Sequence, residues 1–453
     1  MALEILVLAA GLGKRMRSGL PKVLHPLAGR PLLAHVLDTA RELSPRKIIV
    51  VHGHGAEQVQ KAFPEKKIEW VLQAEQLGTA HAVMQAMPRV SADADVLVLY
   101  GDVPLVRAAT LKRLLEAARE GLAVLTADLE DPAAYGRVVR DASGRVQRIV
   151  ELRDASPAER EIREINAGFY ALSAKRLSAW LKKIDNRNVQ KEYYLTDLVA
   201  LALAERTPVV AVKAEHPWEA AGVNSKGELA RLERQYQRIA SERLLEAGVT
   251  LADPARIDVR GELECGKDVS IDVNCVFEGR VKLGDGVRVA ANCILRNVTV
   301  AAGCEILPFC HLEDSGIGER CRIGPYARLR PGNALAEDVH IGNFVEVKAS
   351  RLGAGSKANH LTYLGDSEVG ARVNVGAGTI TCNYDGAAKH RTVIEDDCFI
   401  GSDATLVAPV RIARGSYIGA GSTISKDTPA GQLTVARAPQ RSIPGWKPPR
   451  KKA

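Results

Sequence analysis

Residues 317–347 read IGERCRIGPYARLRPGNALAEDVHIGNFVEV, and an apolar side chain returns at every sixth position of this stretch. The same spacing recurs over residues 271–295 and 394–424. An α-helix would repeat its apolar residues every three or four positions, and a simple strand every second one. A period of six instead indicates short strands joined by regular turns, with one side chain of each hexad entering a continuous core. This half of the chain is therefore predicted to form a parallel β-helix.

The composition is that of a soluble globular protein, with 46% apolar and 26% charged residues in a chain of 453. This length predicts two or more domains. No run of about 18 apolar residues is present, so we expect no membrane span. The sequence begins with a strand-like segment rather than with the basic and apolar regions of a signal peptide, which predicts a cytoplasmic protein.

The eight cysteines all lie between residues 265 and 398, and no two of them form a C-x-x-C pair. A zinc site would need that ligand spacing. In a reducing compartment we expect the thiols to serve as small apolar fillers of a narrow coil.

The net charge of +8 is compatible with either nucleic acid or small anionic ligands. The basic residues are dispersed, apart from a short tail formed by Lys447 and residues 450–452. No aromatic platform for stacking bases accompanies them. The pattern favours phosphorylated metabolites as substrates, with neither nucleic acid nor a membrane as a partner.

The first half of the chain alternates strand and helix signals. Residues 3–10 read LEILVLAA, which is typical of a buried parallel strand, and Gly11-Leu12-Gly13-Lys14-Arg15-Met16 follows it. The two glycines allow close approach of a ligand, and the basic residues supply positive charge. The stretch matches neither the dinucleotide fingerprint, which needs a third glycine, nor the Walker pattern.

A carboxylate follows a later strand of this half. Residues 96–100 form a predicted strand, and Gly101-Asp102 comes directly after it. Open α/β sheets bind their ligands at the carboxyl ends of the strands, where Mg²⁺ bridging phosphates would find oxygen ligands. Another predicted strand, 47–51, ends at His52-Gly53-His54, which we interpret as a loop rather than a metal site. The first half is therefore predicted to be a Rossmann-like nucleotide-binding α/β domain.

Residues 225–247 form a predicted amphipathic helix that ends at Gly248 and connects the two halves. The expected organisation is an α/β domain over 1–224, a linker helix over 225–248, and a β-helix domain with a tail over 249–453. From about residue 251 to residue 424 the coil would have roughly ten turns.

Four motifs resemble one enzyme family. They are Leu8-Ala9-Ala10-Gly11-Leu12-Gly13-Lys14-Arg15-Met16 with Pro21-Lys22, then residues 359–366 (NHLTYLGD), 374–378 (NVGAG) and 382–386 (CNYDG). The combination resembles the bifunctional bacterial enzyme glucosamine-1-phosphate N-acetyltransferase / N-acetylglucosamine-1-phosphate uridylyltransferase, from Leu8 to about Arg437. The resemblance implies a left-handed β-helix, a homotrimer, and synthesis of UDP-N-acetylglucosamine for peptidoglycan and lipopolysaccharide. It also implies Mg²⁺ as cofactor and acetyl-CoA as co-substrate.

The resemblance implies roles for residues of the first half in uridylyl transfer. Asp102 and Asn224 would hold Mg²⁺, and Lys22 would meet the phosphates. The implied nucleotide- and sugar-binding residues are Leu8, Ala9, Ala10, Gly11, Lys22, Gln73, Gly78, Thr79, Tyr100, Gly101, Asp102, Gly136, Glu151, Asn166 and Asn224. The interval from Gly136 to Glu151 is one residue longer than in the family pattern, and a longer turn at Ser143-Gly144 would explain it.

In the second half the resemblance makes His360 the general base of acetyl transfer. The implied sugar-phosphate residues are Arg330, Lys348, Tyr363, Asn374 and Lys389. The implied acetyl-CoA residues are Ala377, Asn383, Tyr384, Ser402, Ala420 and Arg437. Arg330 and Lys348 each directly follow an inward-pointing residue of the hexad pattern, so their side chains should point outward.

The hexad pattern fails where most of these residues lie. It slips between 347 and 352 and between 364 and 369, with His360 and Tyr363 between the slips, and it is interrupted from 375 to 394. Two other functions are compatible with the same architecture. The coil could only regulate or oligomerise a nucleotidyltransferase, or the protein could be a non-catalytic scaffold. The first would leave His360 without a role, and the second would leave Lys22 and Asp102 unexplained.

Overall fold

The computed structural model describes residues 2–53, 55–65, 67–132 and 134–448. The chain divides into two compact units, residues 1–236 and 237–453, and the boundary falls within helix α8, Lys226–Glu246. Each unit is described by itself. Within the described residues, no helix is long and apolar enough to cross a membrane. The tail residues 450–452 and His54 lie outside the described residues.

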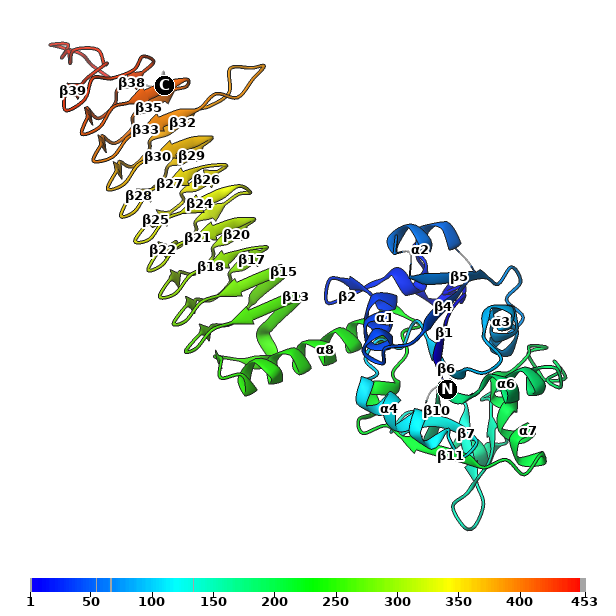
Figure 1. Ribbon diagram of the computed structural model, residues 1–453. Coiled ribbons are helices and arrows are strands. Elements are labelled where there is room, and N and C mark those ends of the chain that lie inside the picture. Colours follow the sequence, from blue (N-terminus) through cyan, green and yellow to red (C-terminus); the bar gives the residue numbers. More distant parts are fainter. Residues whose placement is uncertain (1, 54, 66, 133, 449–453) are drawn as a thin grey trace, which may run out of the picture. The chain divides into compact units, whose positions relative to one another are not determined.

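The first unit is a three-layer α/β structure (Figure 1). Its strands are β1 Leu3–Ala9, β2 Pro26–Leu27, β3 Arg30–Pro31, β4 Lys47–His52, β5 Ile68–Leu72, β6 Asp95–Tyr100, β7 Leu122–Asp128, β8 Arg137–Arg140, β9 Val146–Val150, β10 Glu164–Ser173 and β11 Val209–Lys213. Its helices before α8 are α1 Leu32–Glu42, α2 Ala56–Ala62, α3 Thr79–Ala86, α4 Ala108–Ala117, α5 Pro157–Arg160, α6 Ala174–Leu181 and α7 Leu198–Ala204.

The main sheet of this unit has the order β11-β7-β10-β6-β1-β4-β5, and only β10 along this path runs antiparallel to its neighbours. Side chains of α1, α2 and α4 join the apolar core on one face of the sheet, and those of α3, α6 and α7 join the core on the other. Strand β1 lies between β4 and β6. The chain runs from β1 to β4 and β5 on one side of it, and then returns to β6 on the other side. Such a reversal opens a crevice at the carboxyl ends of the strands.

The second unit is a parallel β-helix, as the hexad spacing predicts (Figure 1). One of its two sheets, here called face A, has eleven strands against the roughly ten turns expected. Face A comprises β12 Thr250–Leu251, β14 Ser270–Ile271, β16 Arg288–Val289, β19 Glu305–Ile306, β22 Arg322–Ile323, β25 His340–Asn343, β28 Lys357–His360, β31 Asn374–Val375, β34 Phe399–Ile400, β37 Tyr417–Ile418 and β39 Leu433–Thr434.

The other sheet has 17 strands and bends at every coil, so that it supplies the two remaining faces, B and C. It begins with the long strands β13 Ile257–Cys265 and β15 Cys275–Leu283. Face B continues with β17 Ile294–Arg296, β20 His311–Glu313, β23 Arg328–Leu329, β26 Glu346–Lys348, β29 Tyr363–Gly365, β32 Ile380–Cys382, β35 Thr405–Val407 and β38 Thr423–Ile424. Face C continues with β18 Thr299–Val300, β21 Ser315–Ile317, β24 Asn333–Leu335, β27 Arg351–Leu352, β30 Ser367–Val369, β33 Thr392–Ile394 and β36 Val410–Ile412.

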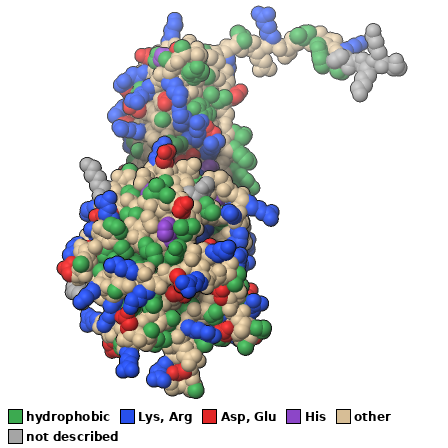
Figure 2. Space-filling view, turned by 90° about the vertical axis from the view of Figure 1, so that its right-hand side faces the viewer, with side chains coloured by type: hydrophobic (Ala, Val, Ile, Leu, Met, Phe, Trp, Pro, Cys, Tyr) green, Lys and Arg blue, Asp and Glu red, His purple; other side chains and the backbone are tan. Residues whose placement is uncertain are grey.

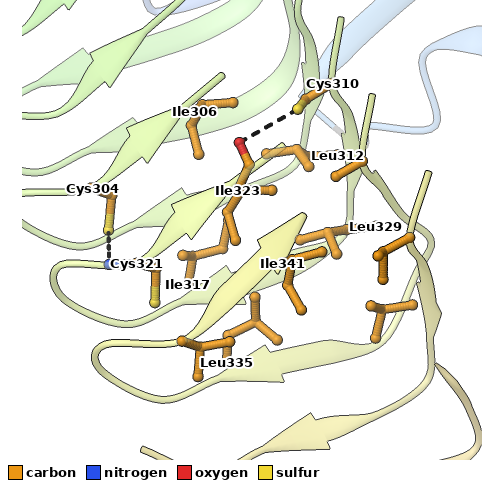
Figure 3. Close-up of a cluster of buried hydrophobic side chains, with 14 of the residues drawn as sticks. Cys304, Ile306, Cys310, Leu312, Ile317, Cys321, Ile323, Leu329, Leu335 and Ile341 are labelled. Carbon is orange, nitrogen blue, oxygen red and sulfur yellow. Dashed lines mark hydrogen bonds between the residues drawn. The ribbon is translucent and has the colours of Figure 1, made fainter. Parts of the chain in front are cut away.

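The residues of the hexad pattern form the core of this coil. Figure 3 shows Ile317, Ile323, Leu329, Leu335 and Ile341 stacked inside successive coils, and each is at most 5% exposed. Six of the eight cysteines are buried among them and all eight are free thiols, while Cys265 and Cys382 are half-buried. The expectation that cysteines fill the coil is therefore confirmed for six of them.

Candidate functional sites

The first candidate site is a cleft at the carboxyl ends of β1 and β6 in the α/β unit. It has a volume of about 490 Å³. The loop after β1 carries Gly11, and the turn after β6 carries Asp102. Because both strands are parallel neighbours in the sheet, their following loops open on the same edge. The sheet therefore brings together loops that lie about 90 residues apart in the sequence.

Most of the residues expected in this site line the cleft. They are Leu8, Ala9, Ala10, Gly11, Lys22, Gln73, Gly78, Thr79, Tyr100, Asp102, Gly136, Glu151, Asn166 and Asn224. Gly101 is the exception, because it does not line the cleft and packs against Ala9 instead. A Cβ added to Gly101 would lie 3.2 Å from the Ala9 side chain. Sequence reasoning did not single out Tyr135 and Thr196, which also line the cleft.

Three polar side chains of the cleft meet in one group. The Lys22 ammonium forms a salt bridge with Asp102 Oδ2 and donates a hydrogen bond to Asn224 Oδ1 over 3.1 Å. The amide and the carboxylate come from segments 122 residues apart in the sequence. Their oxygens therefore converge on one cation, which is the arrangement that a hard divalent metal ion requires of its ligands.

A second group of polar residues in the cleft surrounds Glu151. Burial raises the pKa of its carboxyl group, and Thr196 Oγ1 donates a hydrogen bond to it over 3.4 Å. An added Cβ on Gly136 would lie 3.5 Å from Glu151 Oε1, so the two residues face each other closely. Asn166 is held by the Tyr170 hydroxyl, 2.7 Å from its amide nitrogen. These groups offer one anionic acceptor and one oriented amide to a polar ligand.

The hairpin between Gly136 and Glu151 contains a tight turn at residues 141–145. Asp141 Oδ1 accepts hydrogen bonds from the backbone N–H groups of Ser143 and Arg145, both over 2.9 Å. Gly144 lies in this turn with φ 80°, a conformation that favours glycine. The turn at residues 141–145 closes a hairpin in which Gly136 lies opposite Glu151, and the expectation that this turn holds an additional residue stays a prediction.

The second candidate site lies on the coil, at the corner where face A turns into face B. Backbone hydrogen bonds link this corner from coil to coil: Leu361 N to Asn343 O, Gly378 N to His360 O, Asp403 N to Ala377 O and Gly421 N to Ser402 O. The accepting residues therefore stack in one column, here called the histidine column, in the order Asn343, His360, Ala377, Ser402 and then Ala420. Three residues expected at the coenzyme thus lie directly beyond the expected base.

His360 is exposed at this corner, and its Nδ1 lies 2.8 Å from Asn343 Oδ1. Sequence reasoning did not single out Asn343. Its signal was its position, because it lies one coil before His360 in the repeat. Arg437, expected at the coenzyme, reaches the same column and donates a hydrogen bond to the Ala420 carbonyl over 2.6 Å.

Face B carries a group of cations near its border with face C. Lys348 and Lys389 lie beside each other, and the neighbouring Lys348 ammonium lowers the pKa of Lys389, with a smaller contribution from Arg330. Asp366 lies 3.5 Å from the Lys348 ammonium and also accepts a hydrogen bond from Asn383. Two neighbouring lysines beside a single carboxylate favour an anion such as a phosphate group.

The remaining residues of this site are less concentrated. Asn383 lies 3.4 Å from the Tyr363 hydroxyl and so joins the cation group. Tyr384 is 61% exposed in the loop that leaves the coil after β32 (Figure 1). Asn374, expected with the sugar phosphate, lies on face A, whereas Arg330, Lys348 and Tyr363 lie on or beside face B. A single chain therefore does not gather all the residues expected at this site.

Among the described residues, no group of three or more His, Cys, Asp or Glu side chains is arranged to hold a metal ion. Asp102 and Asn224 form a smaller donor set, one carboxylate and one amide, which leaves further positions for ligand oxygens. On the face of the molecule seen in Figure 2, Lys and Arg side chains are spread over the surface, with fewer Asp and Glu side chains among them.

Comparison with known proteins finds relatives for both units of the chain. Three family models match the chain: a MobA-like NTP transferase domain over residues 5–167, a GMPPB C-terminal domain over 259–354, and bacterial transferase hexapeptide repeats over 391–426. The bifunctional protein GlmU of Cupriavidus pinatubonensis is 60% identical over 452 residues, which cover 100% of both chains. That of Azoarcus sp. is 60% identical over 448 residues and 99% of both chains, and that of Chromobacterium violaceum is 58% identical over 452 residues, 100% of this chain and 99% of the relative. The chain belongs to the family of bifunctional GlmU proteins.

Proposed function

We propose that this enzyme makes UDP-N-acetylglucosamine in two reactions. The first transfers an acetyl group from acetyl-CoA to glucosamine-1-phosphate, and the second transfers a uridylyl group from UTP to the N-acetylated sugar phosphate. The product is a precursor of peptidoglycan and lipopolysaccharide. The observation that carries the proposal is the pairing, in one chain, of a phosphate-binding cleft with an exposed, oriented histidine on a hexapeptide coil. We assign uridylyl transfer to residues 1–224, acetyl transfer to residues 249–453, and the link between them to residues 225–248.

In uridylyl transfer, a phosphate oxygen of the sugar-1-phosphate attacks the α-phosphorus of UTP, and the bond to pyrophosphate breaks in line. The protein contributes position and charge rather than a covalent intermediate. Lys22 lies at the phosphate end of the cleft, where its ammonium offsets negative charge. Gln73, Gly78 and Thr79 are assigned to the uracil end. Glu151, Asn166 and Gly136 are assigned to the N-acetylated sugar.

The cleft residues fit a divalent metal ion. The oxygens of Asp102 and Asn224 already converge on one cation, the Lys22 ammonium, and both are of the type that Mg²⁺ prefers. We propose that Asp102 and Asn224 hold Mg²⁺ when the nucleotide binds. The ion would supply charge neutralisation at the phosphate oxygens.

In acetyl transfer, the 2-amino nitrogen of the sugar attacks the thioester carbonyl carbon, a C–N bond forms, and the C–S bond to coenzyme A breaks. His360 Nε2 accepts the proton that the amine loses, and the proton passes to the departing thiolate. A positioned base of this kind contributes about 10²–10⁴ in rate. Arg330, Lys348, Tyr363 and Lys389 are assigned to the sugar phosphate. The assigned coenzyme residues are Ala377, Asn383, Tyr384, Ser402, Ala420 and Arg437.

We further propose that the acetyl-transfer site is completed between copies of the chain in a homotrimer. Asn374 lies on face A, away from the cations of face B, so one coil alone offers an incomplete sugar-phosphate site. A neighbouring coil set against the exposed corner of His360 would supply the missing wall.

The deciding experiment supplies the purified enzyme with glucosamine-1-phosphate, acetyl-CoA, UTP and Mg²⁺ and follows UDP-N-acetylglucosamine by chromatography. Free coenzyme A and pyrophosphate are measured in parallel, which separates the two reactions. Chelation of divalent ions should stop pyrophosphate release while coenzyme A release continues. Release of pyrophosphate alone, with intact acetyl-CoA, would instead mean that the coil has no catalytic role.

A further inference from the structure

We infer that Asn343 is a positioning residue that fixes the tautomer and the ring orientation of His360. The inference rests on the proposed acetyl transfer and adds a residue to it. Asn343 and His360 are register partners in the parallel strands β25 and β28, one coil apart. The Asn343 amide oxygen lies 2.8 Å from His360 Nδ1.

The contact determines which ring nitrogen can act as a base. A carbonyl oxygen of an amide only accepts hydrogen bonds, so Nδ1 must carry the proton in this contact. In the neutral ring the other nitrogen, Nε2, then holds the free lone pair. Loss of the Asn343 oxygen would leave both tautomers available, and only one of them presents a base on the Nε2 side.

The backbone of His360 is already fixed, so the side-chain torsions are the freedom left to control. The His360 carbonyl accepts hydrogen bonds from Thr362 Oγ1 over 2.8 Å and from the Gly378 N–H over 3.4 Å. Thr362 itself is only 3% exposed. The imidazole, by contrast, is exposed, so core packing does not hold it. In the described part of the chain, the hydrogen bond to Asn343 is the side-chain polar contact that orients the ring.

The direction of the ring follows from the histidine column. Asn343 lies on the coil before His360, and Ala377, Ser402 and Ala420 lie on the coils after it. A hydrogen bond that ties Nδ1 to the coil before turns Nε2 away from that coil. The small side chains of the following coils leave space on the side that Nε2 faces.

The orienting group is neutral, which distinguishes this pair from a carboxylate–histidine pair. Two carboxylates beside the cations of face B are engaged in ion pairs: Glu346 with Arg330 over 3.0 Å, and Asp366 with Lys348 over 3.5 Å. Asn343 therefore orients His360 without adding negative charge beside it. An aspartate at this position would keep the accepting oxygen, whereas a leucine would keep the volume and remove it.

The test compares N343D and N343L in the full-length enzyme. For N343L we expect kcat of acetyl transfer to fall by about 10- to 100-fold, by analogy with the loss of partners that orient metal-binding histidines, with KM for both substrates unchanged. N343D should retain kcat to within several-fold, because the acceptor remains. Uridylyl transfer by the same preparations is the internal control for folding.

The tautomer is read directly by solid-state ¹⁵N NMR of histidine-labelled enzyme, with the spectrum of H360Q subtracted to identify the His360 signals. We expect a protonated Nδ1 and an unprotonated Nε2 in the unaltered enzyme and in N343D, and a mixture in N343L. Unchanged kcat in N343L, or a protonated Nε2 in the unaltered enzyme, overturns the inference, as does reduced kcat in N343L with an unchanged tautomer. If the unaltered enzyme lacks acetyl transfer altogether, the proposed function fails, and the ¹⁵N spectra still decide the role of Asn343.

Discussion

The cleft of the α/β unit and the histidine column of the coil differ in how the fold brings their functional side chains together. In the cleft, loops from distant segments converge at one edge of a sheet, and Asp102 is 9% exposed. On the coil, successive turns of one repeat present exposed residues such as His360 and Ser402 in register. The cleft obtains precision from burial, whereas the coil obtains it from the regular stacking of short strands.

The charges of face B illustrate how the repeat is used. Arg260, Glu278, Arg296 and Glu313 follow one another on successive coils, with ion pairs of 3.2 Å between Arg260 and Glu278 and 3.3 Å between Arg296 and Glu313. Exposed pairs of this kind contribute little to stability. Arg330 follows Glu313 and continues the alternation, which ends one coil later, where the cation Lys348 follows Arg330. Arg330 pairs with Glu346 over 3.0 Å, whereas Lys348 and its neighbour Lys389 share the single carboxylate Asp366, which leaves positive charge available for a phosphate group.

The largest expected effect is a separation of the two activities by single substitutions. H360Q should lower kcat of acetyl transfer by about 10²–10⁴ because the general base is lost, and leave uridylyl transfer unchanged. D102N should lower uridylyl transfer by at least about 10² through loss of a charged ligand beside the phosphates, and leave acetyl transfer unchanged. Separate assays of coenzyme A and pyrophosphate release measure both.

Each of these variants has a matched control in the same element or the adjacent coil. H340Q makes the same change on face A, in strand β25. D95N makes the same change at the opposite end of β6 from Asp102. Both controls should keep both activities. Equal loss of acetyl transfer in H340Q and H360Q would show that any histidine substitution on these strands disturbs the coil. The loss in H360Q would then not identify His360 as the base.

The next largest effect concerns the two cores. L329A removes a fully buried side chain of the coil, and L97A one of the α/β sheet. Each should lower the free energy of unfolding of its own unit by about 2–5 kcal/mol. Urea unfolding followed by loss of acetyl transfer and of uridylyl transfer should show L329A shifting the first transition and L97A the second. A common shift of both transitions in either variant would mean that the units unfold together.

A smaller effect is expected at the sugar-phosphate cations. K389M should raise KM of acetyl transfer for glucosamine-1-phosphate by about tenfold, because one charged hydrogen bond to the phosphate is lost. The substitution also removes the repulsion from Lys348, so kcat should change little. K357M, on exposed face A, is the control and should leave KM unchanged. A lower KM in K389M would mean that repulsion, rather than phosphate binding, dominates at this residue.

The sequence predicts the coil well because its physical requirement is simple. Ile323 and Ile341 must fill the same place in successive coils, so a single period in the sequence reports both the fold and the core. The strands β1 and β6 were predicted for a similar reason, since a strand buried on both faces is apolar throughout. The corners were not, because Phe309 and Tyr326 adopt left-handed backbone angles of 61° and 54° without being glycine. Asn and Asp mark other left-handed corners, such as Asn274 and Asp338, but an aromatic residue carries no such signal.

Of the candidate site residues, Asp102 was expected from its place after an apolar strand, whereas Lys22 and His360 were expected from the family resemblance. Lys22, Asp102 and His360 carry charge or a titratable ring, and the structure places each at a site. Gly101 was expected at the cleft from the family resemblance, yet it packs against Ala9. A glycine's neighbours in space cannot be read from its neighbours in sequence.

The smallest expected effect tests whether the burial of a carboxylate in the α/β unit lowers the stability of that unit. Burial, with the charges of Asp185 and Asp154, raises the pKa of Asp197 to about 6 from an ordinary value of 3.8. Below pH 3.8 the carboxyl group is protonated in both the folded and the unfolded state. Between pH 3.8 and 6 only the folded state keeps the proton, so the free energy of unfolding falls as the pH rises and stays low above pH 6. D197N should therefore increase the free energy of unfolding at pH 8 by about 1 kcal/mol, allowing for partial solvent screening, and should change it little at pH 4. Urea unfolding at both pH values measures the difference, and D93N, at an exposed aspartate, should show none. A D197N variant that is less stable than the unaltered protein at pH 8 would mean that the carboxylate makes favourable contacts that outweigh the cost of its burial.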